Sequence, residues 1–93
     1  MIGSFRDTDT EKVFLGQFVK RLPPTILRVG LRKLLIIDAA EALEDLRSPP
    51  GNRLEKLSGN FEGYYSIRIN NQWRIVFQWK EERAEEVKIV DYH

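Results

Sequence analysis

The spacing of apolar residues changes once along this chain, at Ser48-Pro49-Pro50-Gly51-Asn52. Before this segment, apolar residues recur at steps of three and four, which is typical of helices. After it they alternate with polar residues, which is typical of strands. Prolines next to a glycine favour a loop at the boundary. The pattern therefore predicts an α+β fold, in which helices from the first half pack on a sheet formed by the second half.

We expect the order strand, helix, helix and then four strands, with the helices packed on a mostly antiparallel sheet. The helices would cover residues 9–20 and 25–45. Asp7 or Thr8 is a suitable cap for the first helix, and Pro23-Pro24 would end it. The strands would cover residues 2–5, 53–57, 64–70, 73–79 and 86–93, with turns at 70–72 and 80–84.

The composition fits one small folded domain spanning residues 1–93. A hydrophobic fraction of 42% with a net charge of +1 excludes an intrinsically disordered chain. The sequence has no cysteine, so it has neither a disulfide nor a thiol nucleophile. No apolar run is long enough to span a membrane, and residues 1–5 lack the pattern of a signal peptide. We therefore expect a cytoplasmic protein with no membrane partner.

The second predicted helix has apolar residues on two sides. The broader side fits the core and comprises Ile26, Leu27, Leu31, Leu34, Leu35, Ile37 and Ala42. The other side carries Val29, Ile36 and Leu43 at seven-residue steps, among the basic residues Arg28, Arg32 and Lys33. This second stripe contacts either a partner chain or another segment of the same protein. The basic stretch of residues 12–37 fits nucleic-acid contact and a solvated face equally well.

Basic and aromatic residues gather on the outer side of the later strands. The inward positions are apolar or aromatic, namely Tyr65, Ile67, Ile69, Trp73, Ile75 and Phe77. Arg68 and Arg74 then share the outer face of adjacent strands with Tyr64, and the chain ends in Asp91-Tyr92-His93. Arginine binds phosphate, tyrosine stacks on unpaired bases, and histidine and aspartate transfer protons. The set is therefore suited to binding and cleaving RNA.

Each of these residues also has a purely structural explanation. Arg68 and Arg74 would equally form surface ion pairs with acids such as Glu62 or Glu86, and a terminal histidine is commonly solvated. Asp91 and His93 could both contact one metal ion. Two ligands are too few to predict a metal site, and we predict no cofactor.

Several segments of the chain together resemble one known family. They are Met1-Ile2, Ser4-Phe5-Arg6-Asp7, Leu22-Pro23-Pro24, Leu43-Glu44-Asp45-Leu46-Arg47, Pro49-Pro50-Gly51-Asn52-Arg53-Leu54-Glu55, Gly63-Tyr64-Tyr65-Ser66-Ile67-Arg68-Ile69-Asn70, Gln72-Trp73-Arg74-Ile75 and Asp91-Tyr92-His93. They are similar to the HigB-type toxins, also called proteic killer proteins, of type II toxin-antitoxin modules in the RelE/ParE superfamily. The resemblance spans the whole chain.

The resemblance implies a RelE-like fold and an endoribonuclease that cuts mRNA in the ribosomal A site without metal or cofactor. It also implies a HigA-type antitoxin with a helix-turn-helix domain, and contact with operator DNA only through the antitoxin complex. By the same resemblance, Arg74 binds phosphate, Arg68 is a basic RNA-binding position, and Asp91, Tyr92 and His93 are catalytic.

One position departs from the family pattern. Several relatives have lysine then glycine where this chain has Ser58-Gly59, and Lys56, on the same face of a regular strand, is the candidate replacement. A missing cation near the transition state costs on the order of a hundredfold in rate. A weak toxin acting mainly as a co-repressor is therefore one alternative function, and a ParE-like gyrase inhibitor is another. Under every reading, the stripe of Val29, Ile36 and Leu43 fits antitoxin binding.

Overall fold

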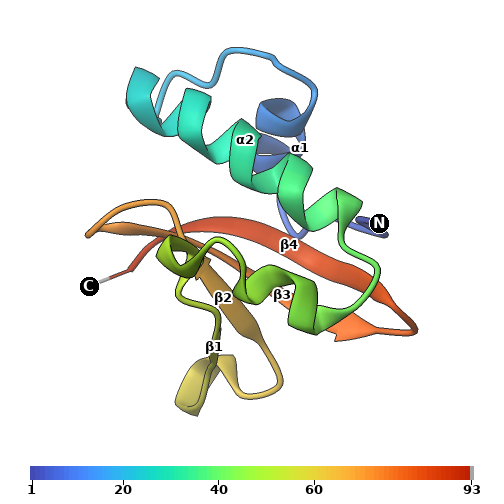
Figure 1. Ribbon diagram of the computed structural model, residues 1–93. Coiled ribbons are helices and arrows are strands. Elements are labelled where there is room, and N and C mark those ends of the chain that lie inside the picture. Colours follow the sequence, from blue (N-terminus) through green and yellow to red (C-terminus); the bar gives the residue numbers. More distant parts are fainter. Residues whose placement is uncertain (93) are drawn as a thin grey trace.

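The computed structural model describes residues 1–92, which form two helices and a sheet. The helices are α1 (Thr8–Phe14) and α2 (Pro24–Ala39), and the strands are β1 (Glu55–Lys56), β2 (Tyr65–Arg68), β3 (Trp73–Lys80) and β4 (Arg83–Asp91). Short 3-10 helices cover Leu43–Arg47, Pro50–Asn52 and Gly59–Phe61. The strands pair antiparallel in the order β1-β2-β3-β4, and both helices lie on the same side of the sheet (Figure 1). The predicted α+β class and arrangement are confirmed.

The predicted first strand, residues 2–5, is not a regular strand. Ile2 and Phe5 each form a single parallel bridge to β4, with Ala84 and Val87 respectively. The segment therefore extends the sheet at its β4 edge, on the side away from β1.

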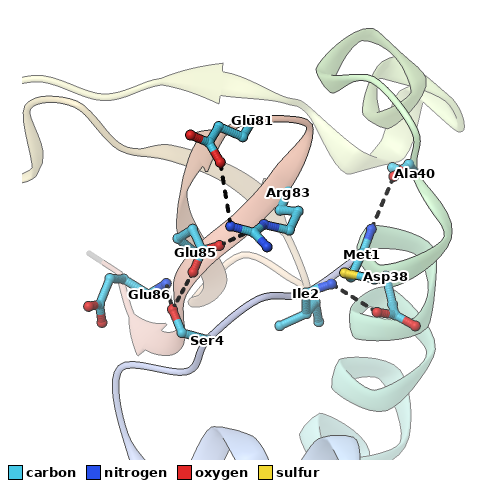
Figure 2. A network of polar contacts seen from close by, with 9 residues as sticks. All are labelled: Met1, Ile2, Ser4, Asp38, Ala40, Glu81, Arg83, Glu85 and Glu86. Carbon is cyan, nitrogen blue, oxygen red and sulfur yellow. Dashed lines mark hydrogen bonds and ion pairs between the residues drawn. The ribbon is translucent and has the colours of Figure 1, made fainter.

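Polar contacts hold this N-terminal segment between α2 and β4 (Figure 2). The backbone N–H of Ile2 donates to Asp38 Oδ1 at the end of α2, at 2.9 Å. The Ser4 hydroxyl donates to Glu85 Oε1 at 2.8 Å and accepts from the backbone N–H of Glu86 at 2.9 Å. The segment thus ties the helical layer to the last strand.

Helix α1 is shorter than predicted because a glycine ends it. Its start is as expected, since the Asp7 carboxylate accepts from the backbone N–H of Thr10 at 3.0 Å. At the other end Gly16 has φ +76°, and the N–H of Gln17 donates to the carbonyl of Lys12 at 2.8 Å. This is the usual helix stop built on a left-handed glycine. Phe18, predicted on the apolar face of the helix, is 72% exposed.

Helix α2 ends at Ala39, six residues before the predicted end at residue 45. The Asp45 carboxylate accepts from the backbone N–H groups of Glu41 and Ala42, at 2.9 and 3.0 Å, and starts a separate 3-10 helix over Leu43–Arg47. An acidic side chain that caps local N–H groups competes with helix continuation. The predicted helical stripe therefore ends before Leu43.

The two sides of α2 also differ from the prediction. Ile26, Leu34 and Ile37 are buried as expected, but Leu35 is 51% exposed. Lys33, predicted on the solvent-facing side of the helix, is buried instead, with 6% of its surface exposed.

The predicted inward face of the sheet is confirmed at its centre. Ile67, Ile75 and Phe77 are fully buried against the helices, and both tryptophans pack at the margin of the core. The outer face is more buried than predicted, because Ser66 and Val76 are also fully buried. They are register partners, and the Arg74 side chain runs along the strands to reach Ser66.

Both predicted turns of the sheet are present. At residues 70–72 the Asn70 side chain accepts from the backbone N–H groups of Gln72 and Trp73, both at 2.8 Å. This fixes the register that places Arg68 directly opposite Arg74. The second turn is tighter than predicted, since β4 begins at Arg83, after two left-handed residues at 81 and 82.

Candidate active site

A cavity of about 220 Å³ lies beside the β2–β3 turn. Its lining residues are Arg53, Arg68, Asn70, Asn71, Arg74 and Tyr92. Within residues 1–92, three arginines therefore line one cavity, and none of its lining residues carries a carboxylate. Such a site has the charge and the fork-shaped donors that suit phosphodiesters.

Arg74 is the most firmly held of these residues, with 13% of its side chain exposed. Its Nη1 donates to the Ser66 hydroxyl at 2.9 Å, and its Nη2 donates to Glu55 Oε1 at 3.3 Å. Its guanidinium carbon lies 5.2 Å from the centre of the Tyr92 ring. Since a guanidinium has five N–H donors, fixed in one plane, some remain for a ligand. Arg74 is thus oriented before any phosphate binds.

Arg68 reaches the same cavity from the neighbouring strand. The two arginines are register partners in an antiparallel pair, so their side chains share one face of the sheet, as predicted. The Arg68 guanidinium donates to Asn71 Oδ1 in the β2–β3 turn. The turn therefore orients Arg68 in the way that Ser66 and Glu55 orient Arg74.

The predicted C-terminal trio is divided between the two faces of the sheet. Tyr92 lies on the arginine face, with 38% of its surface exposed. Asp91 is the register partner of Trp73 on the core side, and its Oδ2 accepts from Gln72 Nε2 at 3.1 Å. Successive residues of a strand point to opposite faces, which explains the separation. His93 lies outside the described residues.

Two predicted RNA-binding residues lie away from the cavity. Tyr64 packs edge-on against Phe61, and the guanidinium carbon of Arg6 lies 5.6 Å from its ring centre. Lys56 is exposed and pairs in register with Tyr65, so it points to the face opposite Arg74. Neither residue is among those that line the cavity with Arg68 and Arg74.

Two further residues at the site were missed by the sequence analysis. Arg53 lines the cavity, and Glu55 shares a face with its register partner Ser66 and forms the ion pair with Arg74. The only sequence signal is their i, i+2 spacing in the predicted strand at residues 53–57, which puts both on one face. Which residues they would meet depends on strand register, which this spacing does not reveal.

The predicted antitoxin-binding stripe is partly covered by the protein itself. Val29, Ile36 and Leu43 are all half-buried, and Ile36 and Leu43 pack against the core. More exposed apolar side chains lie elsewhere on the helical layer, at Leu15, Phe18 and Leu35.

The described part of the chain contains neither a metal-type cluster nor a membrane-spanning helix. Within residues 1–92 no three acidic or histidine side chains gather as a metal site would require. Over the same residues no helix is both long and apolar enough to cross a bilayer.

The fold is similar to that of one chain in each of two solved toxin-antitoxin complexes. A chain of the YoeB–YefM complex from Staphylococcus aureus superposes with a TM-score of 0.62 at 20% sequence identity, covering 100% of this chain and 98% of that one. A second structure of the heterotetrameric complex from the same organism gives a TM-score of 0.55 at 18% identity. These superpositions show a shared fold, and the family model that matches the chain describes a RelE-like toxin.

Residues 3–93 match a protein-family model described as the RelE-like toxin of type II toxin-antitoxin system HigB. The chain belongs to this HigB-like toxin family. It is 49% identical to Toxin HigB-1 of Vibrio cholerae over 76 residues, which are 81% of this chain and 80% of that protein. It is 30% identical to Endoribonuclease HigB of Proteus vulgaris over the full length of both chains. The predicted family is thus confirmed, and the predicted enzyme class, endoribonuclease, is confirmed at the level of the family.

Proposed function

We propose that this toxin is a ribosome-dependent mRNA endonuclease that needs no metal ion, acts in the cytoplasm, and is neutralised by a HigA-type helix-turn-helix antitoxin. The observation that carries the proposal is the cavity in which Arg68, Arg74 and Tyr92 meet. Two oriented guanidinium groups beside an aromatic ring match a phosphate next to an unstacked base.

The reaction consistent with this site is attack of the ribose 2′-oxygen on the adjacent phosphorus, with the 5′-oxygen leaving. Arg74 and Arg68 would neutralise the charge that builds on the phosphoryl oxygens, which is the task a metal ion performs in other nucleases. Tyr92 would hold a base by stacking. Arginine stays protonated in proteins, so proton transfer requires other groups.

Two groups are proposed for the proton transfers. Glu55 does not line the cavity, but it has about half of its side chain exposed and pairs with Arg74, so we assign it as the acceptor of the 2′-hydroxyl proton. His93, adjacent to Tyr92 in sequence, remains the proposed donor to the 5′-oxygen. Asp91 contacts Gln72, and we assign it to holding the last strand beside the turn.

The small size of this site supports ribosome dependence. The cavity of about 220 Å³ is much smaller than the stretch of mRNA that has to be held in line with the arginines. An external scaffold that presents the mRNA in line with the arginines would supply the missing orientation.

Antitoxin binding is proposed on the helical layer. Val29 is half-buried and stands apart from the core cluster that Ile36 and Leu43 join, so a charge there tests the interface without emptying the core. Val29→Asp should weaken antitoxin binding at least tenfold by calorimetric titration. Thr25→Asp, an exposed change on the same helix, is the matched control. Equal affinity of both variants would remove Val29 from the interface.

A purified translation system tests the proposed activity. Reporter mRNA would be incubated with the toxin either on stalled ribosomes or alone, and the 5′ ends would be mapped by primer extension. We expect cleavage at the A-site codon only with ribosomes. Equal cleavage of naked mRNA would refute ribosome dependence, and intact mRNA with loss of gyrase supercoiling would favour the gyrase inhibitor.

A further inference from the structure

A buried lysine and a buried asparagine join α2 to the loop beside the active site. Lys33 Nζ donates to Asn52 Oδ1 at 2.5 Å, with both residues nearly inaccessible. Asn52 Nδ2 in turn donates to the carbonyls of Leu46 and Ser48, at 3.2 and 3.1 Å. Every polar atom of the Asn52 side chain is thus used to hold the loop in one path.

The next residue, Arg53, has a backbone conformation that the loop must enforce. Its φ of +45° and ψ of +57° lie in the left-handed region. This conformation is unfavourable in free energy for any residue that has a Cβ atom. Its N–H donates to the carbonyl of Pro50 at 3.1 Å. In this conformation Arg53 lines the cavity together with Arg68 and Arg74.

Among residues 1–92, Arg53 differs from the other two arginines in having no side-chain partner. Arg74 is paired with Ser66 and Glu55, and Arg68 with Asn71. Within residues 1–92 the Arg53 guanidinium forms no hydrogen bond and no ion pair. Its donors are therefore all available to an incoming anion.

We propose that Arg53 binds a second phosphodiester of the RNA, next to the one that Arg68 and Arg74 hold, and that the Lys33–Asn52 contact is the positioning device for it. Arg68 and Arg74 come from directly opposed strand positions, whereas Arg53 lines the same cavity from a separate loop. This inference rests on the proposed function, because it adds a substrate contact to the same site.

The test is single-turnover cleavage of an A-site mRNA codon on programmed ribosomes, measured against toxin concentration. Arg53→Ala should raise the half-saturating concentration about tenfold, the effect of one lost charged contact, and change the maximal rate little. The slope of log affinity against log salt should fall by about 0.7. Arg47→Ala removes the same charge from an exposed site outside the cavity, and serves as the matched control.

Asn52→Ala tests the positioning role through its dependence on Arg53. If Asn52 acts through Arg53, the double variant Asn52→Ala/Arg53→Ala should cleave no worse than Arg53→Ala alone. If the effects of the two single substitutions on the half-saturating concentration add fully, Asn52 acts independently of Arg53 and has only a structural role. Because Asn52→Ala leaves the buried Lys33 without its partner, Lys33→Met is the second variant should Asn52→Ala not fold.

The outcomes separate this inference from the proposed function. If the wild type cleaves and Arg53→Ala has the same half-saturating concentration as Arg47→Ala, the inference is overturned and the proposed function stands. A fall in maximal rate with unchanged half-saturation would place Arg53 at the scissile phosphate and refute the second contact. No cleavage by the wild type would overturn the proposed function, and the inference with it.

Discussion

Replacing Arg74 by alanine should abolish most of the activity while the protein stays folded. One lost cation at the transition state costs on the order of 100- to 1,000-fold in rate. The cost in stability is smaller. The buried Ser66 hydroxyl loses a donor that is worth about 1 kcal/mol, and the half-exposed Glu55 pair and the Tyr92 contact add at most about 1 kcal/mol each.

The assay separates these two effects. A small domain is stable by at least about 5 kcal/mol, so a loss of about 1–3 kcal/mol leaves nearly all molecules folded and cannot cause a hundredfold fall in cleavage. Cleavage rate and urea unfolding would be measured on the same preparation of Arg74→Ala. Ser66→Ala is the matched control, because it removes the same hydrogen bond and keeps the cation.

The control decides between the two roles of Arg74. Ser66→Ala should keep its rate within about fivefold of the wild type while losing about 1 kcal/mol of stability. Arg74→Lys should recover part of the rate, because it keeps the charge without the planar fork. If Ser66→Ala lost as much activity as Arg74→Ala, the hydrogen bond between the two residues, and not the Arg74 charge, would account for the activity. The reasoning would then be wrong.

Three further predictions concern single residues. Tyr92→Phe should keep near wild-type cleavage and Tyr92→Ala should lose about ten- to a hundredfold, since stacking requires only the ring; equal loss in both would assign the role to the hydroxyl. Burial, with a smaller contribution from the Arg32 charge, lowers the pKa of Lys33. The unfolded chain therefore binds more protons, and the free energy of unfolding of the wild type relative to Lys33→Met should rise with pH up to about 10.4, as urea titrations would show; a pH-independent difference would refute the shift. Asp7→Ala should lose about 0.5–2 kcal/mol by thermal unfolding through the helix cap, more than Asp9→Ala, which loses only its ion pair to Arg21.

The parts of the site that the sequence predicted are those fixed by short-range geometry. Asn70 and Asn71 form a turn by their own chemistry, and the turn sets the register that pairs Arg68 with Arg74. The alternation of extended residues likewise places Tyr92, directly after the end of β4, on the face opposite Asp91.

The parts that escaped prediction depend on local caps that compete with apolar periodicity, or on contacts between distant residues. Gly16 ends α1, and α2 ends at Ala39 before the residues that Asp45 caps, although the apolar spacing continues to Phe18 and Leu43. Arg53 reaches the cavity because Lys33, nineteen positions before Asn52, fixes the loop from the buried side of α2. A lysine among other basic residues gives no sign of such a contact, so sequence periodicity assigned it to the surface.

The most direct test of the central claim is to map the 5′ ends of cellular mRNA after the toxin is induced without its antitoxin. Wild-type toxin and Arg47→Ala should both produce new ends at in-frame positions within coding regions, and Arg74→Ala should produce none. Growth arrest by the wild type with intact messages would contradict the account.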